Sequence, residues 1–185
     1  LGKGRLLWYL AQLIETTDGF SNFVSVRLPC GIRLEYEEVS PGIYEATHLT
    51  HTRLLEEPTA DTRFVLAFTD GRKFYFNNEG YNTLIKDHNG NSVNLLYTND
   101  SKISSMYDGE GNLAFFNYIG NQIVTVSDQT GRQVLLSYEI GDLGNPLLSS
   151  ISRGTNAIYY SYNNQDKLID IKNSDSESVA SFDYD

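Results

Sequence analysis

The 185-residue sequence predicts an all-β fold, built as an antiparallel meander of short hairpins. Three observations predict it. Aromatic residues end short alternating apolar runs at a regular spacing, turn sequences recur at the same spacing, and the composition favours strands. With 13 Tyr and 9 Phe the chain is rich in residues that suit a pleated sheet, and 15 Gly supply turns.

The repeat is visible from about residue 70 onward and has a period of 20 to 24 residues. Its aromatic anchors are Phe76, Tyr97, Tyr118, Tyr138, Tyr162 and Tyr184. Three Asp-x-x-Gly turns keep the same spacing, at Asp87–Gly90, Asp108–Gly111 and Asp128–Gly131. In such a turn Asp bonds its own backbone two residues on, and Gly accepts a positive φ. Each repeat is therefore expected to be a hairpin, with these turn and anchor residues in structural roles.

The elements follow from this pattern in chain order. Residues 5–14 fit either a strand or a helix face, because apolar side chains occupy both sides of the run. Hairpins are expected at 23–28 with 32–36, and at 63–68 with 73–76. The repeat then predicts strands at 91–97, 102–107, 112–118, 122–127, 132–138 and 179–184. Looser links are expected at 98–101 and 119–121, a turn at Ser152–Thr155, and a flexible loop at 173–178.

Residues 1–62 lack the strict period, and residues 63–185 carry it, so the chain is divided there into an irregular opening segment and a run of hairpins. Each hairpin contacts only its neighbours in such a run. The core is therefore expected to be a sum of neighbour contacts along a curved strip with unpaired edges.

Charge and composition exclude several classes of function. The net charge of −10 opposes binding to nucleic acid. No apolar run is long enough for a membrane span, and no signal peptide is visible, so an export signal is expected elsewhere. The single cysteine, Cys30, allows no internal disulfide and is expected to be a buried or half-buried small side chain.

Candidate chemistry is sparse. His48 and His51 would point to opposite faces of an extended segment, which disfavours a metal site. The Asp and Asn turns lack the ligand spacing of a calcium loop. No phosphate loop or catalytic triad appears, so we expect no enzyme, no cofactor and no metal. The tyrosine anchors leave two readings open, a structural ladder of half-buried rings or an exposed strip that binds carbohydrate.

The anchor tyrosines, the Asp-x-x-Gly turns and the cadence Gly80-Tyr-Asn-Thr-Leu-Ile-Lys-Asp87 resemble the YD repeats of Rhs proteins. Leu1-Gly-Lys-Gly4 is similar to the start of the regular shell in such proteins, whereas Asn82 stands where an apolar residue is usual. The resemblance implies a sheet ribbon that spirals into a shell, as in Rhs effectors, the B and C components of insecticidal toxin complexes, and teneurins.

From this resemblance we expect a structural segment of a longer bacterial protein, secreted or on the cell surface, that encloses or displays a toxin or other cargo domain. Its partners would be the remaining repeats and the cargo. The alternative is a module that binds carbohydrate or a cell-surface ligand through exposed tyrosines.

Overall fold

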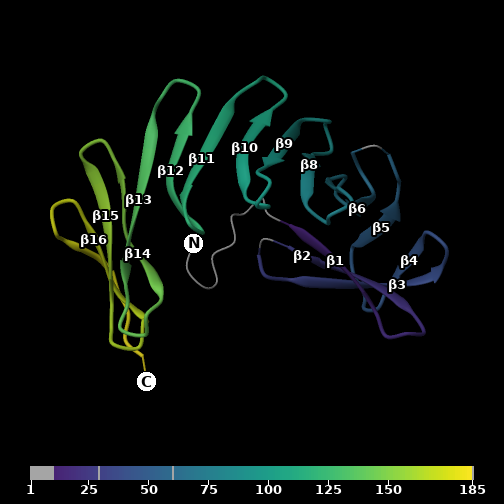
Figure 1. The fold of residues 1–185 in the computed structure, drawn as a ribbon, viewed down its shortest axis with the longest axis horizontal. Helices are drawn as coiled ribbons and strands as arrows, with labels where there is room; N and C mark the ends of the chain where they lie inside the picture. The colour runs from purple at the N-terminus through teal and green to yellow at the C-terminus, as the bar shows by residue number, and fades with distance from the viewer. Residues whose placement is uncertain (1–10, 29, 60, 185) are drawn as a thin grey trace. The chain divides into compact units, whose positions relative to one another are not determined.

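The computed structural model describes residues 11–28, 30–59 and 61–184, and these residues contain 17 β-strands and no α-helix. They form two compact units, one ending at Gly111 and one beginning at Asn112. Within each unit, strands that follow one another in the sequence pair antiparallel, which confirms the expected all-β meander (Figure 1). The predicted division at residue 62 falls inside the first unit, between β5 and β6.

The first unit contains β1 (Gln12–Thr17), β2 (Asn22–Arg27), β3 (Arg33–Ser40), β4 (Ile43–Ala46), β5 (Thr52–Glu56), β6 (Phe64–Phe68), β7 (Lys73–Phe76), β8 (Asn82–Lys86), β9 (Ser92–Tyr97) and β10 (Ile103–Asp108). The second contains β11 (Leu113–Ile119), β12 (Gln122–Asp128), β13 (Gln133–Ile140), β14 (Pro146–Arg153), β15 (Asn156–Tyr162), β16 (Leu168–Asn173) and β17 (Ser178–Ser181).

The expected strands are present with small shifts at their ends. The 5–14 segment was expected to be either a strand or a helix, and its described part belongs to strand β1. Residues 5–10 and Leu1–Gly4 lie outside the described residues. The expected turn at Ser152–Thr155 is shorter, because Ser152 and Arg153 belong to β14 and only Gly154 and Thr155 connect it to β15. The last strand ends at Ser181, so the anchor Tyr184 lies beyond it.

The first unit has a core of its own. Side chains of β1, β2 and β3 are buried together with those of β5, β6 and β7. The cluster consists of Ala11, Leu13, Val24, Val26, Tyr36, Leu54, Phe64, Leu66, Phe74 and Phe76. Burying such side chains is the dominant stabilising contribution to a fold. A core made only of contacts between neighbouring hairpins is therefore wrong for this unit.

One long-range backbone contact joins β1 to the start of β8. The Leu13 N–H donates to the Gly80 carbonyl at 2.9 Å, and Gln12 forms an isolated bridge with Tyr81. A Cβ on Gly80 would lie 2.2 Å from the Leu13 carbonyl oxygen, and its φ is +80°. Glycine is therefore required at this position.

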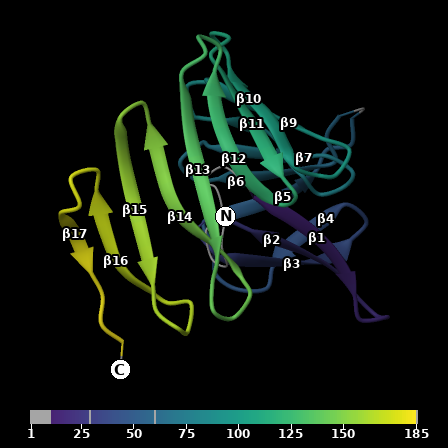
Figure 2. The ribbon, with the colours of Figure 1, turned by 60° about the vertical axis from the view of Figure 1, so that its left-hand side comes forward.

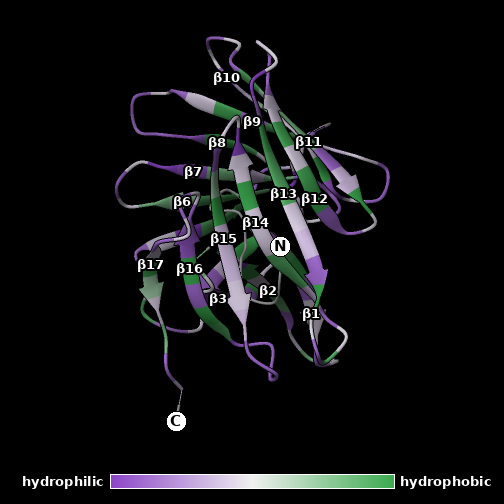
Figure 3. Ribbon diagram, turned by 90° about the vertical axis from the view of Figure 1, so that its left-hand side faces the viewer, coloured by the Kyte–Doolittle hydropathy of each residue, from purple (hydrophilic) through white to green (hydrophobic). Residues whose placement is uncertain are grey.

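The second unit is a twisted sheet in which β11 to β17 lie side by side in chain order (Figure 2). Its two faces differ. The pairing register places Phe116, Val126 and Val134 side by side on one face, and that face continues through Leu136, Ile151 and Ile158. The opposite face carries many Ser, Thr and Gln side chains. Hydrophobic and hydrophilic residues accordingly alternate along these strands, and the turns between them are mostly hydrophilic (Figure 3).

Bulges accompany the aromatic anchors in both units. One extra residue is inserted in the strand that follows each anchor, directly beside the residue with which the anchor pairs. The pairs are Phe76 with Asn82, Tyr97 with Ile103, Tyr118 with Ile123, Tyr138 with Leu148, and Tyr162 with Leu168. A bulge strengthens the local twist of a strand, so the sequence repeat marks a repeated twist.

Candidate functional site

The Asp87 turn shows how five consecutive residues close a hairpin. The Asp87 N–H donates to the Asn91 carbonyl at 3.0 Å, and the Gly90 N–H donates to the Asp87 carbonyl at 3.2 Å. Asp87 Oδ1 accepts the N–H groups of Asn89 and Asn91, at 2.8 and 2.9 Å. Gly90 has φ +88°, the left-handed conformation that a three-residue hairpin loop needs at this place.

The same pair of backbone bonds recurs along the chain, with the same geometry and different side chains. It closes turns that begin at Leu28, Phe68, Asn77, Thr98, Asp128, Gly141, Asn163 and Asn173. In the remaining predicted turn, the Gly111 N–H donates to the Asp108 carbonyl at 3.2 Å. Two expectations are thereby corrected. The Thr98–Ser101 link is as tight as the Asp87 turn, and the 173–178 segment is an ordered turn in which Asn173 replaces Asp and Ser176 replaces Gly.

The acidic turn residues are held ionised by these bonds. The pKa of Asp128 is lowered from 3.8 to about 2, first by the hydrogen bond from the Thr130 hydroxyl and then by bonds from the Arg132 side chain and from backbone N–H groups. The Asn91 side chain is the largest cause of the lowered pKa of Asp87. Hydrogen bonds to a carboxylate favour its charged form. These bonds therefore stabilise the turns at any pH at which the Asp side chains are ionised.

One turn obtains its carboxylate from elsewhere. Gly141 begins a turn and has no side chain. The carboxylate of Asp166, in the next turn on that side of the sheet, accepts the hydrogen bonds instead. Asp166 Oδ1 accepts the Leu143 N–H at 3.3 Å, and Oδ2 accepts the Asn145 side-chain amide at 2.8 Å. A Cβ on Gly141 would lie 2.3 Å from Asp166 Oδ1, so only glycine leaves room for this contact.

Four tyrosine anchors form a ladder through their hydroxyl groups, each of which donates to a backbone carbonyl of the preceding strand. Tyr97 donates to Asn82 at 2.8 Å, Tyr138 to Ile123 at 3.0 Å, Tyr162 to Leu148 at 2.9 Å, and Tyr184 to Leu168 at 2.7 Å. The accepting residue is in each case the one with which the previous anchor pairs across its bulge. The ladder therefore fixes successive bulges to one another.

The anchors Tyr97, Tyr118, Tyr138 and Tyr162 are half-buried, Phe76 is fully buried, and Tyr184 is 49% exposed. Burial raises the pKa of Tyr118 to about 12 and also raises the pKa of Tyr138. A tyrosine ring that is half-buried and whose hydroxyl is bonded to the backbone offers little to a sugar. This geometry favours the structural interpretation of the ladder.

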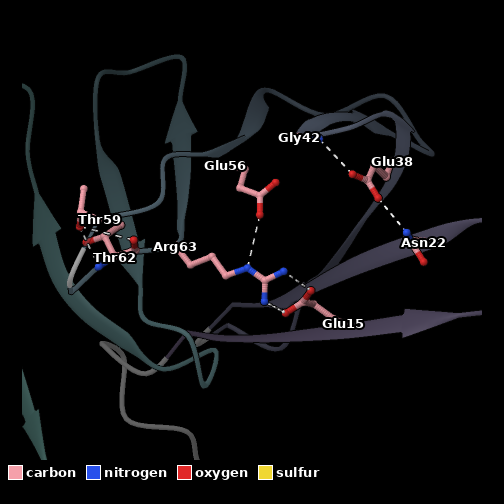
Figure 4. A network of polar contacts seen from close by, with 8 residues as sticks. All are labelled: Glu15, Asn22, Glu38, Gly42, Glu56, Thr59, Thr62 and Arg63. Carbon is pink, nitrogen blue, oxygen red and sulfur yellow. Dashed lines mark hydrogen bonds and ion pairs between the residues drawn. The ribbon is translucent and has the colours of Figure 1, made fainter.

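A second polar cluster lies in the first unit, around Arg63 (Figure 4). The guanidinium donates to both carboxylate oxygens of Glu15, at 2.7 and 2.8 Å, and to Glu56 at 3.4 Å. Its backbone is held on both sides, because the Arg63 N–H donates to the Phe76 carbonyl and the Arg63 carbonyl accepts from Glu57. The bidentate pair ties β1 to the start of β6, 48 residues away in the sequence.

Glu38 and Tyr44 complete this cluster. Glu38 accepts the Asn22 side-chain amide at 2.8 Å and the Gly42 N–H at 3.0 Å. Burial, followed by the negative charges of Glu56, Glu38 and Glu15, raises the pKa of Tyr44 to about 12. Tyr44 therefore stays neutral at physiological pH, and its hydroxyl has no hydrogen-bond partner among the described residues.

These side chains line a surface groove of about 410 Å³. It lies at the polar end of the inner face of β1–β4, whose other end carries Leu13 and Val26 of the core, and Val24 lies between the two ends and lines the groove. The groove could not be found from the sequence, because its residues are spread from β1 to the start of β6 and belong to no recognisable motif. Hydroxyl, amide and carboxylate groups beside an aromatic ring can bind polar ligands.

The residues considered for metal or thiol chemistry lie apart. His48 and His51 are exposed in the segment between β4 and β5, and no group of three or more metal-ligating side chains occurs in the described part of the chain. Cys30 is exposed in the turn between β2 and β3, so the expectation of a buried or half-buried side chain is wrong. The turn projects this residue away from the core.

Comparisons with known protein families and with curated proteins give no match to the chain. Among residues 11–28, 30–59 and 61–184, no helix has the length and apolar character needed to cross a membrane.

Proposed function

We propose that this chain is a non-catalytic, architectural segment of a bacterial Rhs-type YD-repeat protein, secreted or displayed on the cell surface. In this proposal its hairpins form part of a curved strip within a larger spiral shell that encloses or displays a toxin or other cargo domain. The remaining repeats and the cargo are its partners.

The observation that carries the proposal is the tyrosine ladder. Four anchor hydroxyls are bonded to backbone carbonyls of the preceding strand, and the anchors pair across bulges at the same place in each repeat. These contacts use the repeated residues to hold strand to strand. The partly exposed apolar face of β11–β17 supports the same view, because an apolar sheet face is stable when further protein covers it.

The test uses the complete gene product. If the segment helps to enclose a domain, that domain resists a protease in the native protein. Replacing Tyr138 and Tyr162 together by alanine should open the wall and expose the domain to cleavage, whereas Tyr159→Ala should not, because Tyr159 lies on the opposite face of β15. Equal cleavage of the wild-type protein and both variants would contradict the proposal.

A second candidate is binding of a carbohydrate or a cell-surface ligand, favoured by the free Tyr44 hydroxyl in the groove beside Arg63. In this candidate Tyr44 takes the place of the anchor tyrosines Tyr97, Tyr138 and Tyr162, whose hydroxyls are bonded to the backbone. Glycan-array binding that is lost in Tyr44→Ala and kept in Tyr159→Ala would support it. Binding that is lost only when an anchor such as Tyr97 is replaced would return it to the ladder.

A further inference from the structure

The turn between β1 and β2 presents an apolar side chain to solvent in a fixed position. Phe20 is 98% exposed. Asp18 Oδ1 accepts the N–H groups of Phe20 and Ser21, at 2.9 and 2.8 Å. The Thr17 hydroxyl accepts the Gly19 N–H and donates to the Ser21 carbonyl, at 3.1 and 3.0 Å. A loop fixed in this way loses little conformational entropy when it binds.

Acidic groups lie at the same end of the strands as this phenylalanine. The Ser21 hydroxyl donates to Glu37 at 2.7 Å, and Asn22 donates to Glu38, so both carboxylates lie at the same end of the sheet as Asp18. The positive residues of β2 and β3 are Arg27 and Arg33, which lie opposite each other in the strand register at the other end of these strands. The tip of the β1–β2 hairpin is therefore an apolar side chain with a negative rim.

A complementary feature occurs on the apolar face of the second unit. Small side chains, Ala114, Val126 and Val134, line a shallow depression of about 290 Å³. Arg132 and Arg153 line it as well. Arg132 is paired with Asp128 at 2.5 Å, whereas Arg153 is exposed and has no ion pair within the described residues. The depression is apolar with a net positive rim.

We propose that the chain associates head to tail, with Phe20 of one copy inserted into the depression beside Arg153 of a second copy. The occupant follows from charge and polarity. The chain has a net charge of −10, so an apolar depression with an unpaired arginine is a local exception on its surface, and it matches an apolar tip with a carboxylate rim. Because the two surfaces differ, every added copy leaves one of each free, and the contact can propagate.

This contact is small for a protein interface, so weak association is expected. Sedimentation equilibrium of the 185-residue chain should show an average mass that rises with concentration between about 10 μM and about 1 mM. Phe20→Ser and Arg153→Glu should each weaken association by at least about tenfold. Leu49→Ser is the matched control, because Leu49 is also fully exposed and belongs to neither the Phe20 turn nor the lining of the depression. Circular dichroism would verify that each variant is folded.

Mixing the two interface variants tests the head-to-tail geometry. Phe20→Ser keeps only the depression and Arg153→Glu keeps only the tip, so an equimolar mixture should form 1:1 dimers and nothing larger. A wild-type chain that stays monomeric throughout would overturn the proposal. So would a Phe20→Ser variant that associates like the wild type, or a mixture that remains monomeric while the wild type associates.

Discussion

Asp166 belongs to the turn after β15, yet its carboxylate bonds the turn that begins at Gly141, 25 residues earlier in the sequence. Gly141→Ala would place a methyl group against this carboxylate. Displacing the carboxylate should lower the free energy of unfolding by about 1–3 kcal/mol, measured by urea denaturation. Gly141→Asp should be similarly destabilising, since it also brings two carboxylates together.

The loss of stability in Gly141→Asp should be rescued by adding Asp166→Gly. The first replacement restores a carboxylate at the head of its own turn, and the second suits a position whose φ is +57°. The double variant should recover most of the lost stability. A double variant no more stable than Gly141→Asp alone would contradict the idea that Asp166 supplies the carboxylate that residue 141 lacks.

The hydroxyl of Tyr162 can be tested separately from its ring. Tyr162→Phe removes the bond to the Leu148 carbonyl and should lower the free energy of unfolding by about 1 kcal/mol. Tyr159→Phe is the control on the same strand, because Tyr159 lies on the opposite face and is 48% exposed. Equal effects of the two changes in thermal denaturation would argue against the ladder.

At alkaline pH the tyrosines should destabilise the fold. The pKa of Tyr118 is raised to about 12, so above its ordinary value of 10.0 the unfolded state loses the proton first and is favoured. The contribution of Tyr118 to the free energy of unfolding should therefore be constant up to about pH 9 and fall from about pH 10 upward. In Tyr118→Phe the fall should be less steep, and an unchanged slope would contradict the assignment.

Acid should weaken the Asp128 turn. The pKa of Asp128 is lowered from 3.8 to about 2, so its contribution to stability is complete above the ordinary value and is lost as pH falls toward 2. Asp128→Asn should keep the turn, since Asn163 and Asn173 accept the same backbone bonds. It should also remove the acid dependence that comes from this residue. Unfolding measured across this pH range, with carboxyl chemical shifts from NMR, gives both quantities.

Non-glycine residues with positive φ offer a stabilising change. Ser176 has φ +64° at the place that glycine takes in the Asp87 turn. Ser176→Gly should therefore raise the free energy of unfolding by about 1 kcal/mol, and Gly131→Ala should lower it by a similar amount. A loss of stability in Ser176→Gly would indicate that the turn depends on the serine hydroxyl.

The hairpins could be predicted because their chemistry is contained in five consecutive residues. Asp87 and Gly90 form a pattern that has one structural meaning at that spacing. The Asn173 turn was not predicted by the same reasoning, because it does not have the Asp-x-x-Gly sequence. Asn173 supplies the accepting oxygen in place of Asp, and Ser176 adopts the positive φ in place of Gly. Residues 173–178 were therefore expected to be a flexible loop, although they form an ordered turn.

The groove could not be predicted, because it depends on contacts between distant segments. Arg63 meets Glu15 only after β1 has packed beside the strands that follow β5. The residues next to Arg63 and Glu15 in the sequence form no pattern that predicts this ion pair. The exposed position of Cys30 also escaped prediction, since its burial depends on which side of a turn faces the core.

The contact between Leu13 and Gly80 has a consequence for the order in which the chain unfolds. In β11–β17 every pairing among the described residues joins strands that follow one another in the sequence. Strands can therefore detach one at a time, beginning with β17, and exchange their amide hydrogens in that order. In β1–β10 the first strand is bonded to β2 and to the start of β8, so its loss releases both. The first unit should therefore open as a whole, and its amides should share one rate of exchange.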